Sequence, residues 1–266
     1  MAKTAKNSEI LEELKALGPW HFDVRINSHL KTSHANCGDH EGYTFVNPYE
    51  LMGLIKSIYP DGLQGKRFMD AACNSGAYCF VARNRGAEEV FGFDVRDLWI
   101  NQANYLKDCL PGDKENIHFA QCDLMELDSI LPADKKFDIS IFKGIFYHLP
   151  NPVAGLKLVA DRTREVIVVD SDMASHQPDG YLKFIAEGIE NPLSGVHQIA
   201  WAPTGPQVIT DMLSLLGFTT ARTVMWWSPD KDARPGAHGR VRVVASRKPE
   251  LLAHIQSLTE PTITTK

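Results

Sequence analysis

The pattern of apolar and polar positions predicts strands that alternate with helices through the middle of the chain. An apolar run ending at Phe68 and Met69 is followed by a turn of small residues, and apolar positions then recur at helical spacing over 77–84. Gly86 follows as a helix stop, and a second apolar run covers 90–93. Further strands are expected at 116–124, 137–142 and 165–169. This alternation is typical of an α/β fold with a mostly parallel sheet.

The two ends of the chain show different patterns. Residues 8–17 carry apolar positions on one helical face, and 20–32 alternates in part and predicts an extended arm. Asn47, followed by proline and then an acid, predicts a helix start. Apolar runs over 219–227 and 240–246 predict an antiparallel pair that completes the sheet. The last residues, TEPTITTK, predict a loose tail.

Polar residues stand where several of these strands end. Asp70 and Asp94 end the first two strands, Asp123 ends the third, and Asp170 and Asp172 follow the fifth. In an open α/β sheet, ligands bind at the carboxyl ends of the strands. A strand, a small-residue turn at a helix start and an acid at the end of the next strand form a nucleoside-binding unit, in which the acid can accept both ribose hydroxyls. The pattern alone also fits a NAD-type turn or an α/β turn without a ligand.

The stretch 67–95, RFMDAACNSGAYCFVARNRGAEEVFGFDV, resembles motifs I and II of class I S-adenosylmethionine-dependent methyltransferases. Their usual form is D-x-G-x-G-x-G, then about one helix, then an acid at the end of strand 2. Asp70, Asn74, Gly76 and Asp94 stand at the matching positions, and Ala72 and Asn74 replace common glycines. Because asparagine tolerates left-handed backbone, the turn is expected to survive these replacements.

A second segment, FDISIFKGIFYHLPNP at 137–152, resembles the F-D-x-V-x-x-x-G-V-L-Y-H-L-x-x-P of one branch of these enzymes. Tyr147 and His148 match residue for residue. That branch includes enzymes that modify the wobble uridine of tRNA with a carboxymethyl-type group. Trp201, Pro203 and Thr204 extend the resemblance, with Thr204 expected to open a capping box for the next helix.

The resemblance implies a Rossmann-like, seven-stranded class I methyltransferase fold, with a mostly parallel sheet, an antiparallel last strand and an N-terminal helical and arm extension. It implies three segments: residues 1–60 as the helix, arm and lid-like extension, 61–248 as the S-adenosylmethionine-binding domain, and 249–266 as a C-terminal helix or tail. Trp20 in the arm is either part of a lid or packs the arm onto the body.

S-adenosylmethionine is the expected cofactor, and we expect no metal site. An acid in the position of Asp123 commonly accepts the adenine amino group in this family. The cofactor-binding residues that we expect are Asp70, Ala72, Asn74, Gly76, Asp94, Val95, Asp123, Leu124 and Lys143.

The expected chemistry is an in-line displacement on the sulfonium, for which the protein supplies proximity and orientation. An acceptor of high pKa also needs a base, and His148 and Asp170 are the candidates. Tyr147 and Tyr181 are expected to shape the acceptor pocket, with 180–190 forming its wall. A structural role for His148, holding the next loop, is the alternative.

The composition of the chain bears on the class of acceptor molecule and on the cellular compartment. The 266 residues are 44% hydrophobic and 23% charged, with a formal net charge of −5, which offers no overall attraction to nucleic acid. No apolar run approaches the length of a membrane span, no secretory leader is evident, and the five scattered cysteines are typical of reduced thiols. We therefore expect a cytoplasmic protein without a membrane partner.

Four functions remain open from the sequence. Methyl transfer to a small-molecule acceptor leads, and a tRNA-modifying transferase is the second, less favoured. A third attacks the aminocarboxypropyl carbon of the cofactor and releases methylthioadenosine, since Ala72 and Asn74 lie where the amino-acid part binds. The fourth is a non-catalytic S-adenosylmethionine-binding module. The acceptor and the oligomeric state are not fixed by the sequence.

Overall fold

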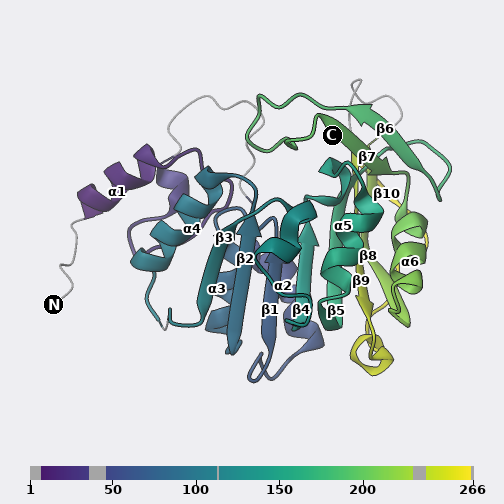
Figure 1. Ribbon diagram of the computed structural model, residues 1–266, viewed down its shortest axis with the longest axis horizontal. Helices are drawn as coiled ribbons and strands as arrows, with labels where there is room; N and C mark the ends of the chain where they lie inside the picture. Colours follow the sequence, from purple (N-terminus) through teal and green to yellow (C-terminus); the bar gives the residue numbers. More distant parts are fainter. Residues whose placement is uncertain (1–6, 36–45, 113, 230–237, 265–266) are drawn as a thin grey trace. The chain divides into compact units, whose positions relative to one another are not determined.

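The computed structural model describes residues 7–35, 46–112, 114–229 and 238–264. The chain divides into two compact units, Met1–Asp123 and Leu124–Lys266. Figure 1 labels their helices and strands. The three segments expected from the sequence, divided at 60/61 and 248/249, stay a prediction. The sequence also predicts a loop at 33–46 and a basic hairpin loop at 229–239, and both lie mostly outside the described residues. No helix in the described ranges is long and apolar enough to cross a membrane.

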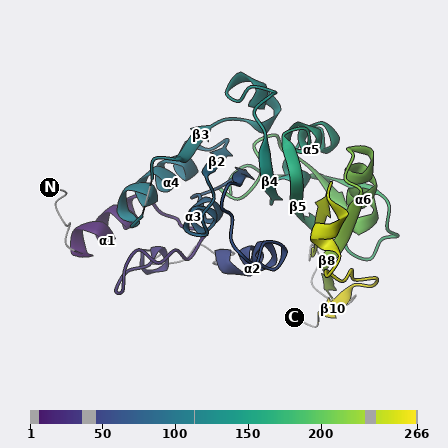
Figure 2. The same cartoon turned by 90° about the horizontal axis from the view of Figure 1, so that it is seen from below.

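The first unit contains a three-stranded parallel sheet. Strand β2 pairs with β1 on one side and with β3 on the other, in a register that sets Met69 opposite Phe91. Helices α2, α3 and α4 lie on one face of these strands (Figure 2). The elements are α1 (Asn7–Ala16), η1 (Thr32–His34), α2 (Pro48–Ile58), β1 (Arg67–Ala71), α3 (Ala77–Asn84), β2 (Glu89–Asp94), α4 (Asp97–Cys109) and β3 (Ile117–Gln121).

Local signals set the helix boundaries of this unit. The side chain of Asn47 accepts a hydrogen bond from the backbone N–H of Tyr49, as expected for the start of α2. Gly86 follows the end of α3 with φ of 94°, a left-handed conformation that suits glycine. Strand β3 ends at Gln121, so Asp123 lies two residues beyond the strand rather than at its end, which corrects our expectation.

The arm after α1 is fastened to its own unit. Trp20 is fully buried, and its Nε1–H donates to the carbonyl of Leu14 at 2.7 Å. The side chain of Gln102 on α4 donates to the carbonyls of Leu17 and Pro19, at 2.7 and 2.8 Å. A buried amide that satisfies two carbonyls holds the arm firmly, so these contacts favour the packing alternative for Trp20.

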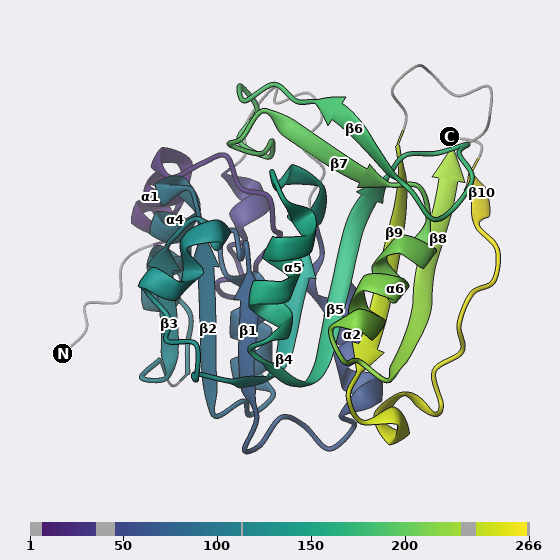
Figure 3. The ribbon, with the colours of Figure 1, turned by 45° about the vertical axis from the view of Figure 1, so that its right-hand side comes forward.

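The second unit contains a five-stranded sheet and a separate two-stranded ribbon. The strand order is β10-β8-β9-β5-β4, in which β4 and β5 are parallel and β9 is antiparallel to both β5 and β8. Helices α5 and α6 lie in front of these strands in Figure 3. The elements are η2 (Leu124–Ser129), β4 (Phe137–Lys143), η3 (Phe146–His148), α5 (Pro152–Ala160), β5 (Thr163–Met173), β6 (Leu182–Ala186), β7 (Ile199–Pro203), α6 (Pro206–Leu215), β8 (Thr220–Pro229), β9 (Gly239–Ser246), η4 (Pro249–Leu252) and β10 (Thr262–Thr264).

Strands β4 and β5 form the core of this unit. Ile139, Ile141 and Phe142 of β4, and the run 166–169 of β5, are fully buried. Continuous apolar runs of this kind are typical of strands covered on both faces. The sequence therefore predicted these two strands from their continuous apolar runs and not from an alternating pattern.

The ribbon of β6 and β7 lies over the carboxyl end of β5 (Figure 3). Its antiparallel register sets Phe184 opposite Trp201, and these two rings pack edge to face at 5.2 Å. The backbone N–H of Ala174 donates to the carbonyl of Pro203 at 2.9 Å and joins the ribbon to the end of β5. The sequence indicates a loop at Trp201, and its place in β7 corrects that expectation.

Two further expectations are wrong in this unit. Helix α6 begins at Pro206, and its Gln207 N–H is capped by the carboxylate of Asp179 at 3.2 Å rather than by Thr204. Thr204 instead bonds Tyr181 across the ribbon, so the expected capping box does not form. Residues 262–264 of the expected loose tail are ordered in a strand, because β10 pairs in parallel with β8.

Candidate functional site

The turn after β1 adopts left-handed backbone at alternate residues. Ala72, Asn74 and Gly76 have φ values of 58°, 50° and 74°. These are the three glycine positions of the motif that the stretch resembles, so the backbone keeps the turn although two glycines are replaced. Gly76 is required for space as well, since a Cβ there would lie 2.4 Å from the Phe119 ring.

Asp94 is joined to this turn. Its Oδ2 accepts a hydrogen bond from the backbone N–H of Asn74 at 2.9 Å, and its Oδ1 accepts one from Arg96 N–H at 3.1 Å. Burial raises the pKa of Asp94 to about 6, against the opposing effect of these two hydrogen bonds. The carboxylate is therefore held in a fixed orientation beside the turn.

The neighbouring residues complete a polar cradle in the first unit. Asp70, at the end of β1, is buried, and Asp123 is half-buried. The carbonyl of Val95 accepts from the side chain of Gln121 at 3.1 Å, which joins the ends of β2 and β3. The hydroxyl of Ser75 is buried and has no hydrogen-bond partner in the described part of the chain.

These features fit S-adenosylmethionine. Buried polar atoms are normally hydrogen-bonded, so the hydroxyl of Ser75 suits a polar ligand group at the turn. A buried carboxylate in the position of Asp94 suits a ribose diol, and the small side chains at 72–76 allow close approach of the ligand. Individual contacts of Asp70, Asp123 and Val95 with the cofactor stay predictions.

Two expected cofactor residues belong to the second unit. Leu124 is buried at the start of η2, where its side chain lies against the position of Gly155. Lys143 ends β4 and is half-buried. Their roles with the cofactor stay predictions as well.

His148 is paired with an acid that the sequence did not point to. Its Nδ1 lies 2.7 Å from Oε2 of Glu187, and their side chains are 11% and 17% exposed. The imidazole also lies against Tyr147, with ring centroids 4.0 Å apart. Because Glu187 lies 39 residues downstream in an irregular loop, no local pattern could have identified this pair.

Tyr147 lies in a charged environment. Burial raises the pKa of its phenol above the ordinary range, the nearby Asp172 adds to that effect, and Arg240 opposes it. The phenol therefore stays protonated and can donate a hydrogen bond. This agrees with a role in orienting a ligand, which stays a prediction.

Asp170 is held by two arginines. It is fully buried, and its two carboxylate oxygens accept hydrogen bonds from Arg240 and Arg242, at 2.6 Å for the first pair. Arg240 also bonds Asp172. Burial would raise the pKa of Asp170, but the two arginines outweigh it and hold the pKa below its ordinary value. A carboxylate that binds protons this weakly is a poor general base.

The position of the paired acids corrects a sequence expectation. Asp170 and Asp172 were expected to follow the fifth strand, but β5 runs on to Met173 and both lie inside it. The antiparallel register sets Asp170 opposite Arg242 and Asp172 opposite Arg240. Two acids and two arginines, each pair spaced by two residues, were a signal of cross-strand pairing that could have been read from the sequence.

Tyr181 precedes the ribbon and points its ring outward. The side chain is 64% exposed, while its backbone N–H and C=O both bond Thr204. The exposed ring is free of the core, so the pocket-shaping role expected for Tyr181 stays a prediction. Among the described residues, no group of three or more histidine, cysteine or acidic side chains could hold a metal ion.

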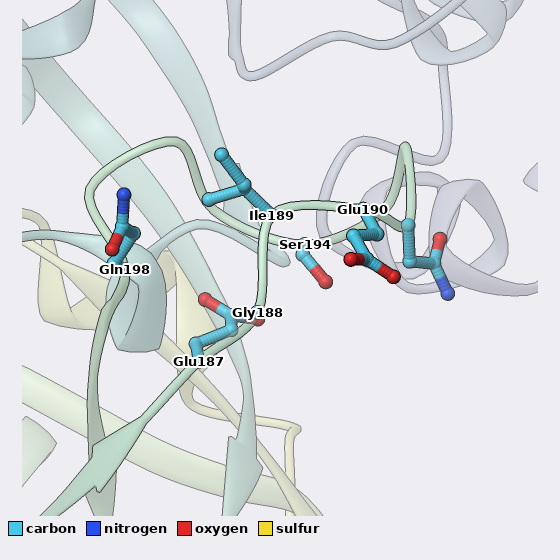
Figure 4. A pocket seen from close by; sticks show the side chains of 7 residues that line it. Glu187, Gly188, Ile189, Glu190, Ser194 and Gln198 are labelled. Atoms are coloured by element: carbon cyan, nitrogen blue, oxygen red, sulfur yellow. The ribbon is translucent and has the colours of Figure 1, made fainter.

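A hollow of about 560 Å³ opens beside Glu187, along the loop that joins β6 to β7. In Figure 4, Glu187 and Gln198 lie at one end and Glu190 at the other, with Ser194 between them. The lining residues that the structure describes include two glutamates and no lysine or arginine: Glu187, Gly188, Ile189, Glu190, Asn191, Ser194 and Gln198. The sequence placed a substrate wall at 180–190, and this hollow overlaps its end.

Known proteins match this chain in both sequence and structure. Residues 63–191 match a family described as a methyltransferase domain. A tRNA U34 carboxymethyltransferase of Alteromonas mediterranea is 26% identical over 172 residues, which cover 61% of this chain and 47% of that protein. The enzyme of that name from Campylobacter hominis is 33% identical over 95 residues, 36% of this chain and 31% of that protein. The chain thus matches half or less of the length of these relatives.

Solved structures show the same fold. The N-terminal domain of EvdMO1 with SAH bound superposes with a TM-score of 0.70 at 18% identity, over 92% of this chain and 98% of that one. An S-adenosylmethionine-dependent methyltransferase of Mesorhizobium loti gives a TM-score of 0.52 at 18% identity, over 73% and 96%. The expected Rossmann-like fold, with mostly parallel strands and one antiparallel strand, is confirmed. Residues 63–191 thus match a methyltransferase domain, and the chain has the fold of class I S-adenosylmethionine-dependent methyltransferases and is similar in sequence to tRNA U34 carboxymethyltransferases.

Proposed function

We propose that this protein transfers the methyl group of S-adenosylmethionine to a hydroxyl or amine of a small polar molecule. The observation that carries the proposal is the His148–Glu187 pair, whose carboxylate residue lines a hollow of about 560 Å³. S-adenosylmethionine would supply a methyl group already activated by its sulfonium charge. The chain's own residues then have three tasks, which are to hold the cofactor, orient the acceptor and take up its proton.

The first unit is suited to hold the cofactor. Asp94 accepts the ribose hydroxyls, and the turn at 72–76 approaches the amino-acid part with its backbone. Asp123 accepts the adenine amino group. Val95 is proposed as a further contact of this unit.

The second unit is suited to handle the acceptor. The Nε2 of His148 takes the proton from the attacking hydroxyl or amine, while Nδ1 donates to Glu187. Tyr147 donates a hydrogen bond to the acceptor from its neutral phenol. Asp170 acts through Arg240 as a structural anchor and not as the base, because its pKa is lowered.

The charge of the hollow favours a small acceptor over a nucleic acid. A volume of about 560 Å³ falls in the range of sites for small molecules. Two glutamates in its lining repel phosphate groups, and the net charge of −5 adds to this repulsion. A neutral or cationic polar molecule is the class that this lining accepts.

The tRNA-modifying function is the second candidate, and the names of the curated relatives favour it. In that reading, the same two units act on a nucleoside of tRNA. The match covers less than half of the length of those relatives, so their acceptor is not carried over to this chain.

One experiment separates these candidates. Purified protein is incubated with S-adenosylmethionine alone, with a small-molecule extract, and with bulk tRNA, and the nucleoside product is identified by mass spectrometry. S-adenosylhomocysteine formed only with the extract supports our proposal, and formation only with tRNA supports the second candidate. Methylthioadenosine above the no-protein control would instead move the reaction to the aminocarboxypropyl carbon. Protein with His148→Ala, which should keep its cofactor affinity and lose turnover, is the control against a non-catalytic binding module.

A further inference from the structure

We infer that Glu187 is the positioning residue for His148, and that Gly195 keeps the space in which the two side chains meet. The inference deepens the proposed function, since it rests on His148 as the base of that reaction. The geometry of the pair is independent of which acceptor is used.

The pair has the geometry of an oriented base. Nδ1 of His148 and Oε2 of Glu187 are 2.7 Å apart, and both side chains are mostly buried. A carboxylate can only accept, so the neutral imidazole must carry its proton on Nδ1. Nε2 then keeps its lone pair and can receive a proton from an acceptor molecule.

Glu187 is itself fixed by its surroundings. Its backbone N–H donates to the carbonyl of Gln198 at 3.2 Å, which continues the ladder of the β6–β7 ribbon by one step. Its Oε2 also accepts from the backbone N–H of Gly195 at 3.1 Å. In the described part of the chain both hydrogen bonds of the carboxylate end on Oε2, so Oε1 can face the hollow that Glu187 lines.

Gly195 is the second half of the arrangement. A Cβ at this position would lie 2.8 Å from Cβ of His148, 3.1 Å from its Nδ1, and 2.9 Å from Oε2 of Glu187. Such distances are too short, so a side chain here would push the imidazole and the carboxylate apart. Gly188 lies in the same loop, and a Cβ there would meet nothing within 4 Å. The loop therefore contains two glycines that can be compared. Gly195 lies against the His148–Glu187 pair, and Gly188 does not.

The test is the tautomer of His148, which needs no acceptor. Long-range ¹H–¹⁵N correlation spectra of uniformly labelled protein distinguish a protonated Nδ1 from a protonated Nε2. The signals of His148 are assigned as those missing in His148→Asn, because the chain has ten histidines. Spectra are recorded at pH 8.5 with S-adenosylhomocysteine present, so that the imidazole is compared in its neutral form.

The expected result is a protonated Nδ1 in the wild type and in the control variants Glu190→Ala and Gly188→Ala. Glu187→Ala and Gly195→Ala should move His148 toward the tautomer protonated on Nε2, which is the form that solvent-exposed imidazole prefers. A wild-type His148 protonated on Nε2, or a tautomer unchanged in Glu187→Ala, would overturn the inference. Thermal unfolding of each variant checks that a change in the spectrum is not caused by loss of the fold.

The turnover number kcat is a second measurement, and it separates this inference from the proposed function. With an acceptor fraction that supports turnover, Glu187→Ala and Gly195→Ala should lower kcat about 10- to 100-fold, with affinity for S-adenosylhomocysteine unchanged. The tautomer shift without any effect on kcat would keep Glu187 as the partner of His148 and reject His148 as the base. Loss of kcat without a tautomer shift would reject the positioning role.

Discussion

The carboxylate of Asp94 is hydrogen-bonded to the backbone N–H of Asn74, 2.9 Å away, although the two residues are twenty positions apart. Asn74 has left-handed backbone, and its N–H donates to this carboxylate at the end of β2. The acid that is proposed to bind ribose therefore also fixes the turn that is proposed to bind the amino-acid part. A change at Asp94 is expected to affect the cofactor site in two ways, by removing the ribose contact and by releasing the turn.

Replacing Asp94 with alanine should weaken binding of S-adenosylhomocysteine. Loss of a charged hydrogen-bond acceptor costs on the order of 1.5–3 kcal/mol, which corresponds to about a 10- to 150-fold rise in Kd. Isothermal titration calorimetry measures it directly. Asp97→Ala is the control, because Asp97 begins α4 and, among the described residues, its side chain accepts a hydrogen bond only from the neighbouring Leu98 N–H. Unchanged affinity in Asp94→Ala would reject this residue as the ribose anchor.

The affinity for S-adenosylhomocysteine should fall in mildly acidic solution. Burial raises the pKa of Asp94 to about 6, so its carboxylate is protonated in the free protein as the pH drops below that value. A protonated carboxyl group accepts hydrogen bonds from ribose less well, so Kd should rise as the pH falls from 7.5 to 5. The same titration with Asp94→Asn should show a much flatter dependence between these two pH values, and an equally steep one would assign the effect to another group.

The same raised pKa predicts a stability change in the free protein. The pKa of Asp94 is about 6 in the folded chain and near 3.8 in the unfolded chain, so the folded state binds more protons between these values. The protonated carboxyl of Asp94 therefore stabilises the folded chain fully below pH 3.8, and this stabilisation is lost as the pH rises through 6. Between pH 4 and pH 7.5, wild type should lose about 2–3 kcal/mol relative to Asp94→Asn. Urea unfolding at both pH values gives this difference, and a difference that does not change with pH would contradict the shift.

The strands and the turn at 67–94 could be predicted because their signals are local. An apolar run, small residues at a turn and an acid at a strand end act within about 25 residues, and the helix start at Asn47 was equally local. The left-handed backbone at Asn74 followed from the known tolerance of asparagine for that conformation.

The acceptor side was predicted less well because its contacts are distant in sequence. His148 meets Glu187 across 39 residues, and Asp170 meets Arg240 across 70. We predicted the end of β5 too early, because a polar triplet such as 170–172 usually marks the end of a strand. The two acids are tolerated inside β5 because arginines on β9 pair with them. The sequence predicted a substrate wall at 180–190, but loop 187–198 has no periodicity that would have identified Glu187 as the partner of His148.

Replacing Ala72 with glycine should stabilise the protein. Ala72 has φ of 58°, a conformation that costs an ordinary residue roughly 1–2 kcal/mol and costs glycine almost nothing. Part of that gain is offset by the greater freedom of glycine in the unfolded chain, so we expect a net gain of about 0.5–1 kcal/mol. Denaturant unfolding measures the change. Ala77→Gly, in the first turn of α3, is the control and should be destabilising by about 1 kcal/mol, since glycine disfavours a helix.

Asp170 and Asp172 offer a final comparison between two acids of one strand. Asp170 is fully buried and bonds both Arg240 and Arg242, whereas the side chain of Asp172 is 36% exposed and bonds Arg240. Removing one partner of a buried ion pair leaves an uncompensated charge, so Asp170→Asn should cost about 3–5 kcal/mol of unfolding free energy. Asp172→Asn should cost about 1 kcal/mol or less, as expected for a pair that solvent reaches.

The pH dependence of this comparison adds a further check. The pKa of Asp170 is lowered in the folded chain, so the stability it supplies is present above pH 3.8 and is lost only as the pH falls below that value. Urea unfolding of both variants at pH 7.5 gives the two costs, and at pH 5 the cost of Asp170→Asn should be unchanged. If Asp170→Asn were as stable as wild type but inactive, the carboxylate would be a catalytic group and not the anchor of Arg240.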